Sequence, residues 1–253
     1  MKPFILAETN WKTIKDQKID LAVLPWGANE AHNYHLPFAT DNIMVEKIAI
    51  ESAQSVWNKG ARIIVLPTIP FGVNTGQLDI KLNINLNPST QFAILNDVID
   101  VLNRHEIYKF LILNGHGGND FKQIIRELGL KYPKMFICSC NWYQSFDNSE
   151  FFENNGGHAD EMETSMMQFL APELVLPLNE AGKGEGKKFK ISALNEKWAW
   201  AERKWTQVTS DTGIGDPSKA TPVKGEQCFK EVIKKVGDLM IELSEADINN
   251  MYE

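Results

Sequence analysis

The chain has 253 residues, of which 43% are hydrophobic and 23% charged, a composition typical of a globular protein with a substantial core. Its formal net charge of −7 argues against nucleic acid or an anionic membrane as a partner, because such partners select a basic patch. Residues 1–10 lack the pattern of a signal peptide, and no apolar run approaches the roughly 20 residues that span a bilayer, so we expect a soluble, cytoplasmic protein.

Short apolar runs alternate with amphipathic segments along the chain. In chain order they predict a buried strand at 21–25, a helix at 41–59, a strand at 63–67, a helix at 89–105, a strand at 110–113, a helix at 119–130, a strand at 135–138 and helices at 160–170 and 225–246. The strand segments are continuously apolar, as in sheets covered on both faces. The alternation therefore predicts an α/β fold with a largely parallel sheet between two layers of helices.

No repeat or composition shift marks a domain boundary, so we predict one domain over residues 1–253. Residues 176–222 are rich in Gly, Lys and Trp without a period, and we interpret them as long active-site loops. Only three cysteines are present, which does not fit a disulfide framework. Cys138 and Cys140 alternate along the fourth predicted strand and are expected to pack in the core, with a C-x-C metal clamp as the alternative.

Four of the five histidines lie in three short segments that are rich in glycine or carboxylates. Histidine is the commonest metal ligand in proteins, and mixed imidazole and carboxylate ligands suit Zn, Mn or Fe. The segments therefore predict a metal site. They are Glu30-Ala31-His32-Asn33-Tyr34-His35 followed by Asp41, Asn114-Gly115-His116-Gly117-Gly118-Asn119, and His158-Ala159-Asp160-Glu161-Met162-Glu163-Thr164-Ser165.

The first segment follows the first predicted strand. Glu30 and His32 are two residues apart, so in extended backbone both side chains point to the same side and can bind neighbouring ions. Asp41 begins the next predicted helix, where a short carboxylate could bridge two ions, and His35 lies nearby. The pattern is typical of a site for more than one ion.

The other two segments lie at the ends of predicted elements. His116 follows the 110–113 strand, and the carboxyl ends of parallel strands are where α/β proteins place their sites. The alternative is a glycine-rich backbone nest for an anion, which His116 only caps. His158, Glu161 and Glu163 stand at a helix start. Glu163 falls at the edge of an apolar face, where a carboxylate needs a metal, a substrate or His158 as its partner.

Two divalent ions held close together activate water and polarise a carbonyl, and His158 or a nearby carboxylate could carry the proton to a leaving nitrogen. This chemistry predicts hydrolysis of an amide or another acyl C–N bond, with a phosphoester left open. Trp198 and Trp200, together with Trp205, suggest flat apolar walls or stacking on sugar faces in a substrate pocket. The fifth histidine, His105, ends a predicted helix and is assigned no function.

The motifs resemble those of the creatininase (creatinine amidohydrolase) family, in the family's order and over most of the chain. The resemblance implies a three-layer α/β/α fold, a homo-oligomer that is commonly a hexamer, and a hydrolytic site for two divalent ions (Zn, Mn or Fe). The matching residues are Leu24-Pro25-Trp26-Gly27-Ala28-Asn29-Glu30-Ala31-His32, His35-Leu36-Pro37, Thr40-Asp41, the second and third segments above, Gly213-Ile214-Gly215-Asp216-Pro217-Ser218, Ala220-Thr221 and Lys224-Gly225.

The resemblance also implies roles for the ligands. Glu30 and His116 would bind one ion, His32 would bind the other, and Asp41 would bridge both. In creatininase itself, a glutamate two residues after the histidine of the second motif completes the ligands of the second ion. Here that position is Gly118, so the creatinine-specific site is not carried over.

We hypothesise that Glu161 supplies the missing carboxylate. That assignment leaves His158 and Glu163 for the chemistry of the water and the leaving group. His35 is expected in a supporting position, with Trp198 and Trp200 near the substrate. Replacing Glu161 by Gln and counting the bound metal tests the assignment.

The main functional hypothesis is a two-metal amidohydrolase that acts on a small cyclic amide or a formamide. One alternative is a metal-dependent hydrolase that opens a cyclic ketone derived from a sugar or inositol. Another is a non-catalytic subunit stabilised by metal. Members of the resembled family act on creatinine, on formamide groups of opened purine-type rings, on a small peptide and on a cyclic polyol ketone, so the fold does not name the substrate.

Overall fold

The four continuously apolar runs form one parallel sheet. The structure, a computed structural model, describes residues 2–154 and 156–253. In it the strands lie in the order β2-β1-β3-β4 and every pair is parallel. The strands are β1 (Leu21–Trp26), β2 (Ile63–Val65), β3 (Lys109–Asn114) and β4 (Phe136–Asn141).

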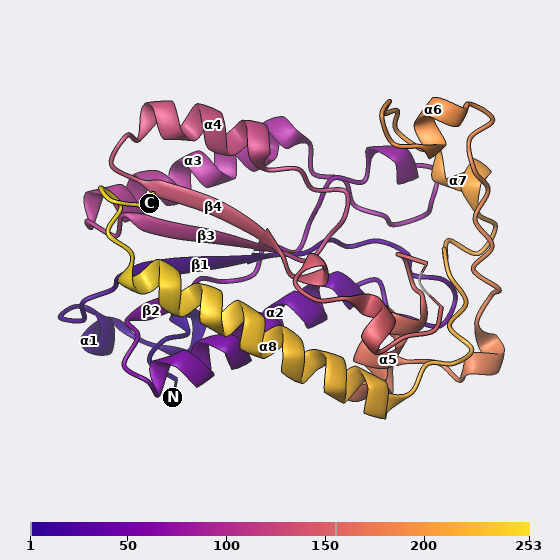
Figure 1. The fold of residues 1–253 in the computed structure, drawn as a ribbon, viewed down its shortest axis with the longest axis horizontal. Helices are drawn as coiled ribbons and strands as arrows, with labels where there is room; N and C mark the ends of the chain where they lie inside the picture. Colours follow the sequence, from indigo (N-terminus) through magenta and orange to yellow (C-terminus); the bar gives the residue numbers. More distant parts are fainter. Residues whose placement is uncertain (1, 155) are drawn as a thin grey trace.

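Helices cover both faces of the sheet. Figure 1 shows α2, α5 and α8 on one side and α3 and α4 on the other. The α-helices are α1 (Trp11–Ile14), α2 (Thr40–Trp57), α3 (Pro88–Arg104), α4 (Lys122–Lys131), α5 (Glu161–Leu170), α6 (Ser192–Asn195), α7 (Trp205–Val208) and α8 (Pro222–Glu245). Short 3-10 helices are η1 (Leu6–Glu8), η2 (Thr75–Gln77), η3 (Trp142–Gln144), η4 (Asn148–Glu150), η5 (Pro172–Leu174) and η6 (Leu178–Glu180).

The strands divide the core into two apolar clusters. Successive strand residues face opposite sides, so Leu21 and Val23 of β1 pack with α2 and α8, whereas Ala22 and Leu24 pack with α3 and α4. All four side chains are buried. The predicted α/β/α architecture with a parallel sheet is confirmed.

The edge strand β4 departs from the sequence-based expectation. It pairs with β3 alone, and most of its residues are only half-buried, so the prediction that it is covered like the central strands is wrong. Cys138 and Cys140 are free thiols that pack, partly exposed, against the core on the α2 side. Neither cysteine joins a group of metal-capable side chains in the described part of the chain.

The segment that carries α6 and α7 lies on the opposite side of the molecule from both chain ends, beyond the carboxyl ends of the strands (Figure 1). Between Leu176 and Pro222 the chain forms only η6, α6, α7 and irregular backbone. Across the described residues, no helix combines the length and the hydropathy that crossing a bilayer requires.

Candidate metal centre

The sheet brings the first two histidine segments to one place. Trp26 at the end of β1 lies in register with Asn114 at the end of β3. The chain after β1 carries Glu30 and His32, and the chain after β3 carries His116. These side chains therefore meet at the carboxyl edge of the sheet, where parallel α/β folds place their sites.

Asp41 lies between two histidines. It is buried in the first turn of α2, and one of its carboxylate oxygens faces each ring. Its Oδ2 is 3.1 Å from Nδ1 of His116, and its Oδ1 is 3.3 Å from Nε2 of His32. Glu30 completes the His116 side, with Oε1 2.9 Å from the same Nδ1. Asp41 therefore presents one carboxylate oxygen to each of the two histidines.

Three overlapping sets of side chains present one donor atom each within 4.8 Å of one another. Two of these sets share Asp41, and each contains one of the two histidines that face it. The third set joins Glu30, His32 and His158. The sets that share Asp41 are Glu30, Asp41 and His116 on one side and His32, Asp41 and Glu163 on the other.

The hydrogen bonds of the rings fit metal ligation. Nδ1 of His32 donates to the backbone oxygen of Glu30 at 3.0 Å, and Nε2 of His116 donates to that of Val73 at 3.0 Å. In each ring the other nitrogen faces the carboxylates. Buried Nε2 of His32 and Oδ2 of Asp41 make no well-formed hydrogen bond. Histidines that bind metals are commonly oriented by such a bond from the second ring nitrogen, so these residues fit a pair of divalent ions.

Without a bound metal ion, the carboxylates of this cluster favour the protonated, positively charged forms of His32 and His116. Burial by itself lowers the pKa of His32, but Asp41, Glu163 and Glu30 outweigh it and raise that pKa to about 10. The pKa of His116 is raised well above its usual value in the same way, by Glu30 and Asp41 against the effect of burial. Metal binding must therefore displace protons from both rings, which makes the affinity for metal rise with pH.

The third histidine stays neutral. Burial and the charge on His32 lower the pKa of His158. Its Nε2 donates to the backbone oxygen of Ala31 at 2.9 Å, which leaves Nδ1 as the acceptor, 3.8 Å from Oε1 of Glu30. The ring also contacts Trp205 in a T-shaped arrangement, with centroids 5.3 Å apart. His158 therefore presents an unprotonated nitrogen beside the cluster.

Glu161 does not reach this cluster, so its expected placement is corrected. Its carboxylate is buried elsewhere, where it pairs with Nζ of Lys224 at 2.5 Å and accepts from the backbone N–H groups of Glu153 and Asn154 at 3.1 and 2.8 Å. Residues two apart on a helix point about 200° away from each other. Glu161 and Glu163 therefore leave opposite sides of α5, and it is Glu163 that faces His32.

Hydrogen bonds at the start of α5 determine which of its side chains face the cavity. Oδ1 of Asp160 accepts from the backbone N–H groups of Met162 and Glu163 at 3.0 and 3.1 Å, which caps the helix. Ala159 N–H donates to Oε2 of Glu163 at 2.5 Å and directs its carboxylate toward the cavity.

At Gly118 a Cβ would collide with the carbonyl of Val73 and with the His116 ring, so no side chain could approach the centre from there.

Of the remaining predicted residues, His35 lies beside the cluster, whereas Trp198 and Trp200 lie away from it. His35 is buried, and its Nε2 lies 2.9 Å from Oγ1 of Thr164, which links the chain after β1 to α5 beside Glu163. Burial, together with the charge on His32, lowers the pKa of His35 to about 4. Trp198 and Trp200 are 75% and 86% exposed and do not line the cavity, contrary to expectation.

A cavity of about 170 Å³ opens onto the metal-capable cluster. Its lining includes four side chains that the sequence analysis does not indicate: Gln77, Tyr143, Asn148 and Arg203. Gln77 hydrogen-bonds Oε2 of Glu30, and Asn83 holds Gln77 in turn by a 2.5 Å bond to its Oε1. A run of asparagines at 83, 85 and 87 was the only sequence signal of such a polar support.

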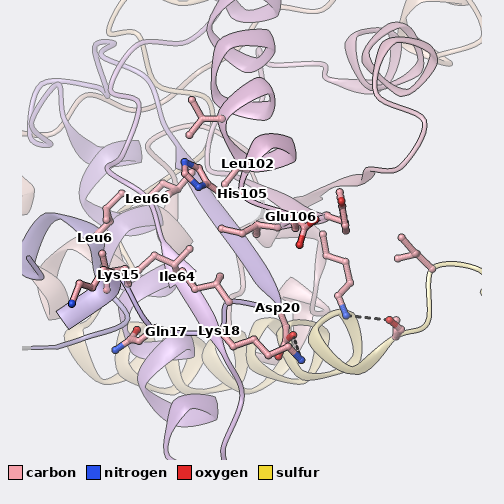
Figure 2. A pocket seen from close by; sticks show the side chains of 18 of the residues that line it. Leu6, Lys15, Gln17, Lys18, Asp20, Ile64, Leu66, Leu102, His105 and Glu106 are labelled. Atoms are coloured by element: carbon pink, nitrogen blue, oxygen red, sulfur yellow. Dashed lines mark hydrogen bonds and ion pairs between the residues drawn. The ribbon is translucent and has the colours of Figure 1, made fainter. Parts of the chain in front are cut away.

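A larger cavity, of about 730 Å³, lies at the other end of the sheet. Figure 2 shows side chains such as Leu6, Ile64 and His105 around it. Its lining includes Asp20 just before β1 and Lys109 at the start of β3, so it lies at the amino ends of these strands. None of the described groups of metal-capable side chains belongs to it. The smaller cavity is therefore the candidate active site, since it contains the polar groups that can do chemistry.

Comparison with known proteins agrees with this geometry. The creatininase family model, described as creatinine amidohydrolase, matches residues 7–240, so the chain belongs to the creatininase family. Proteins of this family and its relatives are named as amidohydrolases or peptidases, and the chain is a creatininase-family hydrolase.

Curated relatives cover most of the chain. The mycofactocin precursor peptide peptidase of Mycolicibacterium smegmatis is 23% identical over 225 residues, which cover 87% of this chain and 84% of the relative. The peptidase of the same name from Mycobacterium ulcerans is 22% identical over 222 residues, covering 83% and 80%.

Solved structures share the fold over its full length. A Bacteroides fragilis protein provisionally named creatinine amidohydrolase is 42% identical, with a TM-score of 0.93 and complete coverage of both chains at 100%. A creatininase structure has a TM-score of 0.82 at 18% identity, covering 98% of this chain and 100% of that one, which shows the fold alone. Solved creatininases include a manganese form and a zinc–zinc form of a mutant.

Proposed function

We propose that the protein is a two-metal amidohydrolase that cleaves the C–N bond of a small amide, such as a cyclic amide or a formamide. The observation that carries this proposal is the position of Asp41, shared by two sets of ligands with one oxygen directed to each. The names of the relatives support an acyl C–N bond, because a creatinine amidohydrolase and a peptidase both hydrolyse amides. The cavity of about 170 Å³ favours a small reacting group.

The ligands divide into two sets around Asp41. Glu30 and His116 would hold one ion and His32 and Glu163 the other, so Glu163 takes the place that the sequence hypothesis gave to Glu161. Mixed carboxylate and imidazole ligands accept Zn, Mn or Fe. Such ions, when bound, polarise the scissile carbonyl and lower the pKa of water.

His158 moves the proton in this proposal. Its Nε2–H is fixed on the backbone oxygen of Ala31, so Nδ1 accepts the proton of the attacking water. Glu30, 3.8 Å from that nitrogen, stabilises the imidazolium that forms. The same Nδ1–H then protonates the leaving nitrogen as the C–N bond breaks. The ring of Trp205 against His158 keeps bulk water from this side.

The alternative functions have less support. Hydrolysis of a sugar-derived ketone relied on three tryptophans that stack on a sugar, and of these only Trp205 lines the cavity, whereas Trp198 and Trp200 lie outside it. A purely structural metal site needs no unprotonated histidine beside it, and His158 offers one. We also propose that the protein is cytoplasmic and, as the family resemblance implies, a homo-oligomer, commonly a hexamer. Light scattering coupled to gel filtration tests the oligomeric state.

Metal removal and reloading test the proposal directly. Protein stripped with a chelator should lose its activity on a panel of formamides, lactams and short peptides, and should recover it with Zn, Mn or Fe. Elemental analysis should find two ions per chain at full recovery. Full activity in protein shown to be free of metal would overturn the proposal.

A further inference from the structure

One cation lines the cavity of the metal-capable cluster. Arg203 shares this cavity with Glu30, His158 and Glu163, and it is the only Lys or Arg among the described lining residues. Its guanidinium carbon lies 4.5 Å from the centroid of the Trp205 ring. Across the described residues the guanidinium forms no ion pair or hydrogen bond with a carboxylate. Burial lowers the pKa of the Arg203 guanidinium, and the charge of Glu30 opposes that effect. The Arg203 guanidinium is therefore available to bind an anion, because no carboxylate of the described residues pairs with it.

The backbone around Arg203 is anchored rather than loose. On one side Glu202 hydrogen-bonds Thr75 of η2, and the carbonyl of Arg203 packs so closely on Gly76 that a Cβ there would collide with it. On the other side Nζ of Lys204 lies 3.3 Å from Asp79. These contacts tie the arginine to the chain that also carries Gln77, the partner of Glu30.

The aromatic support is fixed as well. Trp205 is buried, and its Nε1 donates to the backbone oxygen of Thr212 at 3.0 Å. Its ring system supports the guanidinium and also contacts the His158 ring at an interplanar angle of 86°. A guanidinium stacked on an aromatic ring loses little freedom when it binds, and its planar fork matches the two oxygens of a carboxylate or phosphate.

The charge of the cavity favours an anion once the metal ligands are occupied. Two divalent ions would balance the four lining carboxylates, those of Glu30, Asp41, Asp160 and Glu163. The fourth lining carboxylate, Asp160, is used by the backbone N–H groups of residues 156, 157, 162 and 163. Arg203 adds a further positive charge at the wall of the cavity.

We propose that Arg203 binds an oxyanion of the substrate, a carboxylate or a phosphate, that lies beside the scissile amide. This inference rests on the proposed function and narrows it to acidic amides. Trp205 holds the guanidinium in place and forms the wall between the anion and His158. Arg203 is thus a residue for substrate selection, and the reacting atoms do not depend on it.

Paired substrates test the assignment by turnover. N-formyl amino acids and their carboxamides carry the same scissile bond with and without a carboxylate, and a phosphate-bearing formamide supplies the third arm. In metal-loaded protein, Arg203→Gln should raise KM for the preferred acidic member by about 10–100-fold, as expected for loss of a charge-assisted hydrogen bond, with kcat within about twofold. The carboxamides should be unaffected. Whichever acidic substrate shows the larger rise in KM, the one with the carboxylate or the one with the phosphate, identifies the anion that Arg203 binds.

Two further variants complete the design. Arg203→Lys keeps the charge but loses the fork, so it should recover only part of the affinity. Arg104→Gln removes an exposed arginine at the end of α3, which pairs with Asp100, and should behave as wild type. Equal loss on acidic and neutral substrates in Arg203→Gln, or a loss confined to kcat, would overturn the proposal.

A binding experiment separates this inference from the proposed activity. Inorganic phosphate and acetate are titrated into metal-loaded wild type, Arg203→Gln and Arg104→Gln, followed by tryptophan fluorescence and calorimetry. Arg203→Gln alone should weaken binding of the preferred anion by about tenfold or more. That result in a protein that hydrolyses no amide would leave Arg203 as an anion site and defeat the amidohydrolase proposal. Identical affinities in all three proteins would defeat the Arg203 assignment.

Discussion

Oε2 of Glu163 lies 3.8 Å from Nε2 of His32, although the two residues are more than a hundred positions apart in the sequence. The contact joins the start of α5 to the chain after β1 and closes the second ligand set. It also separates the two glutamates of the third segment, since Glu163 faces the candidate metal centre and Glu161 pairs with Lys224.

Metal content distinguishes these two glutamates. Glu163→Gln should retain one ion per chain, because the set of Glu30, Asp41 and His116 stays intact. Glu161→Gln is the matched control, with the same chemical change two residues away, and should retain two. Elemental analysis after dialysis against chelator-treated buffer measures both. Two ions in Glu163→Gln and one in Glu161→Gln would reverse the assignment.

The free energy of unfolding should rank these two variants in the opposite order, with the larger loss in Glu161→Gln. Glu161 is buried and carries the ion pair with Lys224 and two bonds from backbone N–H groups. Glu161→Gln should therefore lower the free energy of unfolding by about 1–3 kcal/mol. For a chain of this size that is roughly 2–4 °C in Tm per kcal/mol. Glu163→Gln, compared with it in metal-free protein by calorimetry, should change Tm less; a larger loss there would contradict the account.

Metal-free protein should become less stable as pH rises. The pKa of His32 is about 10 in the fold against 6.5 as its ordinary value, so its stabilising proton is fully present below pH 6.5 and is lost as pH rises toward 10. His116 and Glu163, whose pKa values are also raised, act in the same direction. Thermal unfolding in chelator across pH 6.5–9 should show a falling Tm.

Bound metal should reverse that trend. Because the ions replace protons on His32 and His116, the gain in Tm on adding zinc should grow with pH over the same range. The difference between zinc-loaded and chelated samples at each pH is the controlled quantity. A gain that shrinks with pH would mean that the ions bind elsewhere.

The tryptophans give a prediction about catalysis. Trp205 contacts His158 and lines the cavity, so Trp205→Ala should lower kcat/KM by about 10–100-fold, in the range of effects from misplaced catalytic groups. Trp198→Ala and Trp200→Ala should stay within about twofold of wild type in the same assay, because both side chains are largely exposed. Equal losses in all three variants would place the substrate beyond the cavity.

Much of the fold could be predicted from the sequence because its signals are local. Continuous apolar runs such as Leu21–Trp26 and helical spacing such as that of Thr40–Trp57 each depend on neighbouring residues. The proximity of the candidate ligands Glu30, His32 and His116 was equally predictable, since each follows a strand and parallel strands end at one edge.

The rest depended on contacts that the sequence does not encode locally. The choice between Glu161 and Glu163 follows from the helical phase that Asp160 sets at the start of α5. The irregular segment before α8 has no period, so nothing local distinguishes Trp205 from its exposed neighbours. Arg203 and Gln77 reach the cavity only because distant segments pack together, as the α7 and η2 contact shows.

Anomalous diffraction at the zinc edge, on crystals of zinc-loaded protein, tests the central claim most directly. The account predicts two peaks per chain, one beside His116 and one beside His32, with the Asp41 carboxylate between them. A single peak, or two peaks that do not share Asp41, would contradict the two-metal centre.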